Sequence, residues 1–236
     1  AKYHFKRLFS KAGKIVLMSA TIRPNIADKL GIEGQFDFHE VPNPWPSPMR
    51  LVYDLDCPRM NFRCTDEDKN LQAIKIASVL KQDKTGTIHV SSEFQAKDLS
   101  ERLFELGWST WMPEKGSGTD NQLREWYGRR RPGLYCISFS FHEGVDLGED
   151  DICIVAKVPF ASISSNYDRA TMEYDKASYK QDAAYLIEQA CGRTRRGKSE
   201  HYGNAKSVYI ADGSWQSLKS WLSEDFRKAI RKWNGG

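Results

Sequence analysis

Residues 87–107 read Thr-Ile-His-Val-Ser-Ser-Glu-Phe-Gln-Ala-Lys-Asp-Leu-Ser-Glu-Arg-Leu-Phe-Glu-Leu-Gly. The first four residues are typical of a strand. Ser92 begins a Ser-Glu-Phe-Gln capping box, and apolar residues at helical spacing follow it (Ala96, Leu99, Leu103, Leu106). Gly107 is placed to end this helix, and residues 108–112 are expected to form the next strand. The stretch therefore predicts a strand, a helix and a second strand in succession.

The same alternation continues along the chain from residue 51. Strands are predicted over 51–55, 87–90, 108–112, 134–138, 152–158 and 207–211. Helices are predicted over 65–82, 92–106, 119–127, 168–191 with a break near Ser178, and 214–233 as an amphipathic terminal helix. In the first of these helices Leu71, Ile74, Ala77 and Leu80 form the expected apolar side, and in the third Thr119 is the expected cap and Gly128 the expected stop. Strands and helices in this order imply right-handed crossovers, a mostly parallel central sheet and an α/β fold.

The composition excludes several classes of protein. The 236 residues include 35 Lys plus Arg and 31 Asp plus Glu, a net charge of +4 that allows a nucleic-acid partner without requiring one. No apolar run approaches the ~18 residues of a membrane span. The five cysteines (57, 64, 136, 153, 191) form no C-x-x-C pair, which argues against a disulfide framework and a zinc site. We expect reduced thiols and an intracellular protein of the cytoplasm, nucleoid or nucleus.

A proline-rich stretch suggests a boundary between two domains. Residues 40–50 read Glu-Val-Pro-Asn-Pro-Trp-Pro-Ser-Pro-Met-Arg and hold four of the nine prolines, so they cannot form a helix or a central strand. We expect a linker there. Before it, residues 15–18 are continuously apolar, as in a strand that is covered on both faces.

The sharpest motif is Gln-Ala-Cys-Gly-Arg-Thr-Arg-Arg, residues 189–196, at the end of a predicted helix. Arg193 and Arg196 are three residues apart, so one turn would place both on one side. Guanidinium groups grip phosphate oxygens with a rigid fork, and two of them can act as arginine fingers on a transferring phosphoryl group. A solvated basic turn is the alternative interpretation.

Residues 192–199, Gly-Arg-Thr-Arg-Arg-Gly-Lys-Ser, also match the G-x-x-x-x-G-K-[ST] pattern of a phosphate-binding loop. That loop requires a strand before it and a helix after it. Here a helix-like stretch precedes the pattern and Gly203-Asn204 would stop a helix soon after it, so the literal match is disfavoured.

A second motif, Ser-Phe-Ser-Phe-His-Glu-Gly-Val-Asp-Leu, spans residues 138–147. Glu143 and Asp146 follow a strand end, where α/β sheets gather their ligands, and could face a nucleotide ribose or orient an arginine. A polar strand-to-loop turn is the alternative. His142 and Glu143 have no further His or Cys at ligand spacing, so no metal site is predicted.

Hydroxyl groups follow two other predicted strands. Ser19, Ala20 and Thr21 follow the first apolar run, and Ser91 and Ser92 stand where a strand meets a helix N-terminus, a place that suits an anion. Simple caps are the alternative in both places. The acidic run 66–68 is the expected first turn of a helix and not a metal box. Residues 126–131 mix aromatic and basic side chains, as nucleic-acid-binding surfaces do, or form a helix end and a solvated turn.

The order of these motifs, together with Lys-Val-Pro-Phe at 157–160, resembles the second motor domain of XPD/DinG-type superfamily 2 DNA helicases. The resemblance covers residues 15–212, and its most specific parts are Glu-Gly-Val-Asp and Gln-Ala-x-Gly-Arg-x-x-Arg. It implies a RecA-like three-layer α/β/α domain over residues 51–236, and over residues 1–39 the end of a first motor domain. It also implies a DNA-repair type of activity, with ATP and Mg²⁺ between two domains and 5′-to-3′ movement on single-stranded DNA.

The resemblance also implies roles for individual residues. Arg193 and Arg196 match the arginine fingers, and Gln189 matches the glutamine beside the phosphates. Glu143, Gly144 and Asp146 match the motif that links nucleotide to DNA, whereas Ser91, Ser92 and Ser138 match contacts to the DNA backbone. Ser19, Ala20 and Thr21 match the motif that couples hydrolysis to movement.

The sequence departs from the family in several ways. His142 stands where many relatives have Trp, and Arg195 replaces a usually apolar residue. No genuine phosphate-binding loop with a following Asp-Glu box occurs, so we expect a part of a larger protein that hydrolyses no ATP alone and works with a first helicase domain in cis. Two alternatives remain: a non-enzymatic RecA-like module for DNA or protein binding, and a stand-alone NTPase that uses residues 192–199.

Overall fold

The computed structural model describes residues 12–18, 32, 36–39, 41, 51–141, 145–147, 150–162, 165–193 and 206–235. The chain divides into two compact units, Ala1–Pro44 and Trp45–Gly236. In the first unit, residues 14–18 form no regular structure and are exposed, so the strand predicted at 15–18 is wrong. A strand buried on both faces needs neighbouring strands, and none of the described residues of this unit forms one. The predicted linker lies almost wholly outside the described residues.

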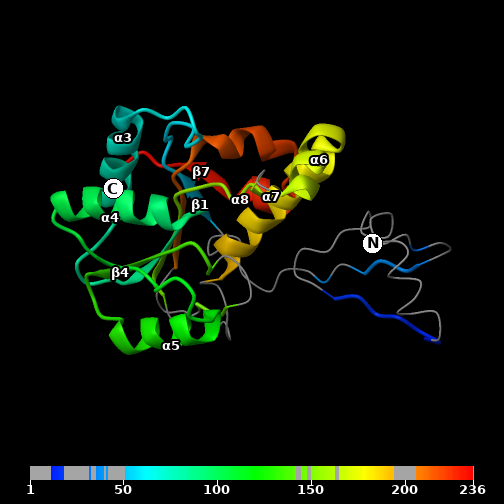
Figure 1. Cartoon of the computed structure of the whole chain (residues 1–236), viewed down its shortest axis with the longest axis horizontal. Coiled ribbons are helices and arrows are strands. Elements are labelled where there is room, and N and C mark those ends of the chain that lie inside the picture. Colours follow the sequence, from blue (N-terminus) through cyan, green and yellow to red (C-terminus); the bar gives the residue numbers. More distant parts are fainter. Residues whose placement is uncertain are drawn as a thin grey trace. The chain divides into compact units, whose positions relative to one another are not determined.

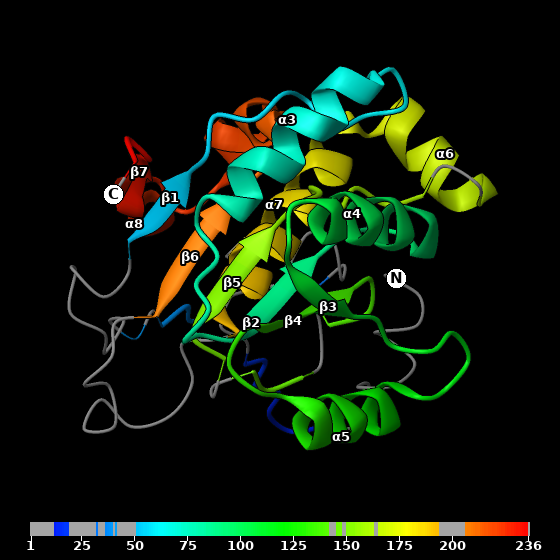
Figure 2. The same ribbon diagram turned by 90° about the vertical axis from the view of Figure 1, so that its left-hand side faces the viewer.

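The second unit contains a parallel β-sheet. Its seven described strands are β1 (Val52–Asp54), β2 (Gly86–His89), β3 (Ser109–Trp111), β4 (Leu134–Ser138), β5 (Ile152–Val155), β6 (Ser207–Ile210) and β7 (Ile230–Lys232). They pair in the order β3-β4-β2-β5-β6-β1-β7, and every pair is parallel. Parallel pairing places all the carboxyl ends at one edge (Figure 2). The predicted α/β class and parallel sheet are confirmed.

Helices cover both faces of the sheet (Figure 1). The helical elements are α3 (Asp66–Ala77), α4 (Glu93–Glu105), α5 (Thr119–Arg129), α6 (Asn166–Tyr174), α7 (Lys176–Gly192), the 3₁₀ helix η3 (Gly213–Trp221) and α8 (Glu224–Ala229). Apolar side chains of α3 and α4 pack on one face of β2, β4, β5 and β6. Those of α7 and η3 pack on the other face, and α5 adds a third cluster beside β4. The three-layer arrangement agrees with the prediction.

The strand–helix–strand unit of residues 86–111 forms as predicted, with one change in its cap. The Gln95 amide donates to Ser92 Oγ at 3.2 Å, so Ser92 caps α4. The Gln95 side chain, however, accepts from the Ser91 amide and hydroxyl instead of completing the capping box. Gly107 has a φ of +84°, a conformation that glycine adopts without strain, and it ends the helix as expected.

Several predicted boundaries are wrong for local reasons. Gly118 precedes α5 and Thr119 is its first residue. The helix passes through Gly128 and ends at Arg129. The break in the 168–191 region falls at Asp175, whose carboxylate accepts from the Ser178 amide at 3.0 Å and starts α7. Strand β5 ends at Val155, before the predicted 158, and α3 ends at Ala77, before the predicted 82.

The predicted terminal helix over 214–233 is also wrong. The segment forms η3, then α8, and then the short strand β7. Ser223 separates the two helical pieces, because its hydroxyl accepts from the Phe226 amide at 3.2 Å and begins a new helix. Strand β7 pairs with β1 and covers an edge that would otherwise carry unpaired backbone groups.

The buried face of α3 differs from the predicted apolar side. Leu71 and Ile74 are 41% and 53% exposed, whereas Gln72, Ala73 and Ile76 are buried. The Gln72 amide group donates to the carbonyl oxygens of Ala156 and Ala211, at 2.5 and 2.6 Å. These carbonyls directly follow β5 and β6, so one buried side chain provides hydrogen-bond donors for the ends of two strands. Because Gln72 must face the sheet, α3 turns Leu71 and Ile74 toward solvent instead of burying them.

A buried carboxylate joins α5 to the sheet. Asp150 is fully buried and accepts from Thr87 Oγ1 at 2.5 Å and from Trp126 Nε1 at 3.3 Å. Arg130 Nη1 forms an ion pair with Asp150 Oδ1, the oxygen that accepts from Trp126, at 3.8 Å. Burial raises the pKa of Asp150 to about 6, although the hydrogen bonds of Thr87 and Trp126 and the charge of Arg130 oppose the rise.

This raised pKa predicts a pH-dependent stability. The folded protein holds the Asp150 proton more tightly than the unfolded chain does, so the Asp150 contribution is fully present below about pH 4 and is lost as the pH rises through about 6. The difference corresponds to on the order of 3 kcal/mol. Urea unfolding of the wild type and of Asp150→Asn between these pH values measures it. We expect the gap between the two profiles to change with pH, and parallel profiles would contradict the prediction.

Candidate functional site

The polar motifs converge where β2 and β4 end. The Val90 amide donates to the Ser138 carbonyl at 3.0 Å, and His89 pairs in register with Ser138. Ser91 and Ser92 follow β2, and the turn that leads to residues 145–147 follows β4. Two segments almost fifty residues apart in sequence are therefore neighbours at the carboxyl edge of the sheet, the edge at which α/β proteins bind ligands.

Ser138 holds the turn after β4. It is fully buried, and its hydroxyl accepts from the amides of Ser140 and Phe141, each at 3.1 Å. The Ser140 hydroxyl in turn donates to Gln122 Oε1 of α5 at 2.7 Å. The side chain predicted to touch a nucleic-acid backbone is thus engaged in shaping the loop.

Arg193 lies against the Glu-Gly-Val-Asp turn. It follows α7, is only 6% exposed, and donates from Nη1 to the Val145 carbonyl at 3.1 Å. The Leu147 amide donates back to the Arg193 carbonyl at 3.3 Å. The main chain and the side chain of one arginine therefore join the two motifs that the sequence singled out.

Asp146 is exposed at the same turn, and its carbonyl accepts a hydrogen bond from the Tyr127 hydroxyl of α5. The Arg130 guanidinium lies 5.1 Å from the centre of the Tyr127 ring. Sequence reasoning noted the aromatic and basic residues here but did not connect them with this turn. In the structure they support it from α5.

Gln189 lies on α7, one helical turn before Arg193, and is partly buried. The helix is fixed on the sheet by apolar packing and by Cys153, whose thiol donates to the Ala190 carbonyl at 3.4 Å. Of the serines after β2, Ser91 is exposed and Ser92 is occupied as the cap of α4.

Other predicted site residues lie outside the described residues. They are Ser19, Ala20, Thr21, Glu143, Gly144 and Arg196, with residues 194–199 of the phosphate-binding-loop pattern. The described start of that pattern, Gly192, is the last residue of α7, so the pattern is entered from a helix and not from a strand.

Asp212 is a structural residue that sequence reasoning missed. It is fully buried after β6 and accepts from the amides of Met60, Val158 and Ser214 at 2.9, 2.9 and 2.8 Å. Lys157 Nζ lies 3.7 Å away as an ion pair. One carboxylate therefore fixes the segments that follow β1, β5 and β6. Its position between a strand and Gly-Ser was the available signal, since aspartate there is typical of a helix cap.

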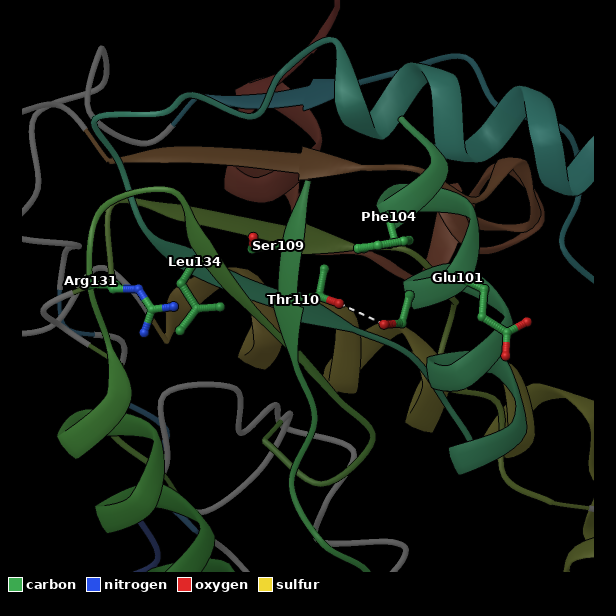
Figure 3. A pocket seen from close by; sticks show the side chains of 7 residues that line it. Glu101, Phe104, Ser109, Thr110, Arg131 and Leu134 are labelled. Carbon is green, nitrogen blue, oxygen red and sulfur yellow. Dashed lines mark hydrogen bonds between the residues drawn. The ribbon is translucent and has the colours of Figure 1, made fainter. Parts of the chain in front are cut away.

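A separate hollow lies at the other end of the strands (Figure 3). It has a volume of about 450 Å³ and is lined by Ser100, Glu101, Phe104, Ser109, Thr110, Arg131 and Leu134. Ser109 and Leu134 begin β3 and β4, so this hollow is remote from the carboxyl edge and from the converging motifs.

No protein-family model and no curated protein matches the sequence. Among solved structures, the chain is similar to Xpd4 of S. tokodaii at 14% identity, with a TM-score of 0.50 over 78% of this chain and 38% of that one. It is also similar to S. cerevisiae Dbp5 bound to RNA and ADP BeF3, at 15% identity and a TM-score of 0.53 over 96% of this chain and 52% of Dbp5. The chain thus has the RecA-like fold of helicase domains and spans about half of these proteins or less.

Within the described ranges, no helix is both long and apolar enough to cross a membrane.

From the buried hydroxyl of Ser138 we predict a loss of stability when it is removed. Ser138→Ala removes the acceptor for two amides, and a buried donor without a partner costs about 1–3 kcal/mol. We expect lower stability in urea unfolding and faster hydrogen exchange at the amides of Ser140 and Phe141. Ser109→Ala, at an exposed position of β3, is the control and should change stability by less than ~0.5 kcal/mol. Equal effects of the two substitutions would contradict this role of Ser138.

Proposed function

We propose that this chain is the second motor domain of an ATP-dependent nucleic-acid helicase of the XPD/DinG type. The position of Arg193 against the Val145 carbonyl carries the proposal, because it joins the arginine motif to the Glu-Gly-Val-Asp turn at the ligand-binding edge of a RecA-like sheet. The similarity to the Dbp5 structure with RNA and ADP BeF3 supports a nucleotide and a nucleic acid as ligands.

In this proposal a first RecA-like domain holds most of the ATP and its Mg²⁺, and this chain supplies residues from across the cleft. Arg196 and Arg193 act on the phosphates, with Gln189 of α7 beside the phosphates as well. Guanidinium groups stabilise the charge of a transferring phosphoryl group and are worth about 10³-fold or more in rate. Arg193 also orients the turn whose Glu143, Gly144 and Asp146 link nucleotide to nucleic acid.

The nucleic-acid contacts of the proposal follow the carboxyl edge. Ser91 is exposed there and Ser92 marks the N-terminus of α4, which favours a phosphate. Ser138 acts on the nucleic acid through the turn that it holds, since its side chain is buried. Single-stranded DNA is the proposed track, and Ser19, Ala20 and Thr21 couple its movement to hydrolysis.

The experiment is an ATPase assay of the polypeptide that joins this chain to its first motor domain, with and without single-stranded DNA. Arg196→Ala should lower kcat by about 10³-fold, whereas the neighbouring Arg195→Ala should leave it within about twofold. Lys198→Ala should leave nucleotide affinity unchanged; its loss would instead indicate the phosphate-binding loop at 192–199. An Arg196→Ala variant with full activity would reject the proposal.

The present chain alone should show no Mg²⁺-dependent turnover above that of its Arg193→Ala, Arg196→Ala double variant. Clear turnover would show that the first domain is dispensable. A RecA-like binding module without motor activity predicts that the longer protein also lacks ATPase activity.

A further inference from the structure

The loop between β1 and α3, residues 55–65, carries an exposed aromatic ring between two arginines. Phe62 is 91% exposed, and the Arg63 guanidinium lies 5.1 Å from the centre of its ring. Arg59 is exposed on the same loop. Within the described part of the chain, neither Arg59 nor Arg63 forms an ion pair.

This loop is firmly held although its tip is exposed. Met60 is buried, and its amide donates to the buried Asp212 carboxylate at 2.9 Å. The Gly213 amide donates to the Pro58 carbonyl at 2.9 Å. A Cβ at Gly213 would lie 2.4 Å from the Cys57 carbonyl oxygen, so only glycine allows this approach.

The tip has its own fixed turn. The Asn61 side chain accepts from the Arg63 amide at 2.8 Å, and the Asn61 carbonyl accepts from the Cys64 amide at 3.1 Å. Phe62 is thus held in the solvent by a turn that hydrogen bonds fix. A ligand that stacks on it would lose little free energy in ordering the protein.

The loop lies at the same edge of the sheet as the proposed nucleic-acid contacts. The carboxyl ends of all the strands meet there, and in Figure 2 the chain runs from β1 along that side to the start of α3. Strands β5 and β6 separate β1 from β2. At ~4.8 Å a strand, the end of β1 is about 14 Å from the end of β2, where Ser91 and Ser92 follow.

We propose that Phe62, Arg59 and Arg63 form a second contact for single-stranded nucleic acid, in which a base stacks on Phe62 and the arginines meet the flanking phosphates. The site extends the track of the proposed function and rests on that function for its partner. Aromatic rings stack on bases of any identity, and arginine adds charge to phosphate and to the stack.

The charges around the loop favour nucleic acid over an apolar protein surface. The acidic residues on the loop and directly after it are Asp56 and those of the first turn of α3. Asp56 pairs with Lys232 at 2.9 Å. Asp66 pairs with Lys69 and Arg102 at 3.3 and 3.1 Å, and Asp68 accepts from the Thr65 amide in a capping box. Glu67 is exposed. Arg59 and Arg63 are thus exposed and form no ion pair with any described residue. Most of the carboxylates near them already have hydrogen-bond or ion-pair partners.

The test measures binding of this chain to a fluorescein-labelled oligothymidylate of about 15 nucleotides by anisotropy, with no nucleotide present. Phe62→Ala should raise Kd about tenfold, and Phe62→Tyr should restore most of the affinity because it keeps the ring. Phe104→Ala is the matched control, since Phe104 is 77% exposed on α4 away from the carboxyl edge. It should leave Kd unchanged.

The double variant Arg59→Gln, Arg63→Gln should bind more weakly. The slope of log Kd against log salt concentration should also fall, by the amount expected for about two lost phosphate contacts. Thermal melting should show all variants folded, because these side chains are exposed.

Three results would overturn this inference: no binding of the oligonucleotide, equal loss with Phe62→Ala and Phe104→Ala, or unchanged affinity in Phe62→Ala. A Phe62→Ala variant with normal affinity but lower ATPase activity in the longer protein would assign the ring to a protein contact. None of these outcomes depends on Arg196, so the test of the ATPase function stands separately.

Discussion

The hydrogen bonds between Arg193 and residues 145–147 are the interaction on which the site depends. They connect the end of α7, which packs on one face of the sheet, with the turn that leaves β4. Because the arginine is buried, its charge would be costly without such acceptors. The turn cannot move far unless this arginine moves with it. A displacement of Arg193 would therefore also displace residues 145–147.

Much of the fold follows from local sequence signals. The βαβ unit at 86–111 was predictable because its cap, its apolar spacing and Gly107 all agree. The parallel sheet then follows from the repeated order of strands and helices. Signals failed where a tertiary partner decides the outcome: the Gln72 amide turns α3 toward two strand ends, and β7 forms because β1 offers an unpaired edge.

In the candidate site, too, some features were predictable from the sequence and others were set by tertiary contacts. The sequence places polar residues after strands, and parallel pairing brings the ends of β2 and β4 together, so their proximity was predictable. The role of each side chain at this edge was not predictable. Ser138 has the residue type of a backbone contact, but burial makes it a support for the turn. Tyr127 and Asp212 support the edge through contacts with other segments. Of the two, only Asp212 carried a local signal in the sequence, that of a helix cap before Gly-Ser.

The fold alone assigns no activity, since RecA-like domains of 14–15% identity share only the architecture. Beyond the fold, several buried polar side chains support the carboxyl edge of the sheet. Gln72 and Asp212 satisfy strand-end carbonyls and loop amides after β1, β5 and β6. Ser138 and Arg193 do the same after β4. Rigid support of these strand ends leaves the exposed groups of the edge, Asp146 and Ser91 among them, in fixed positions before any ligand arrives. In the proposed function, this preorganisation would let a change at the phosphates reach the nucleic acid without first ordering the protein.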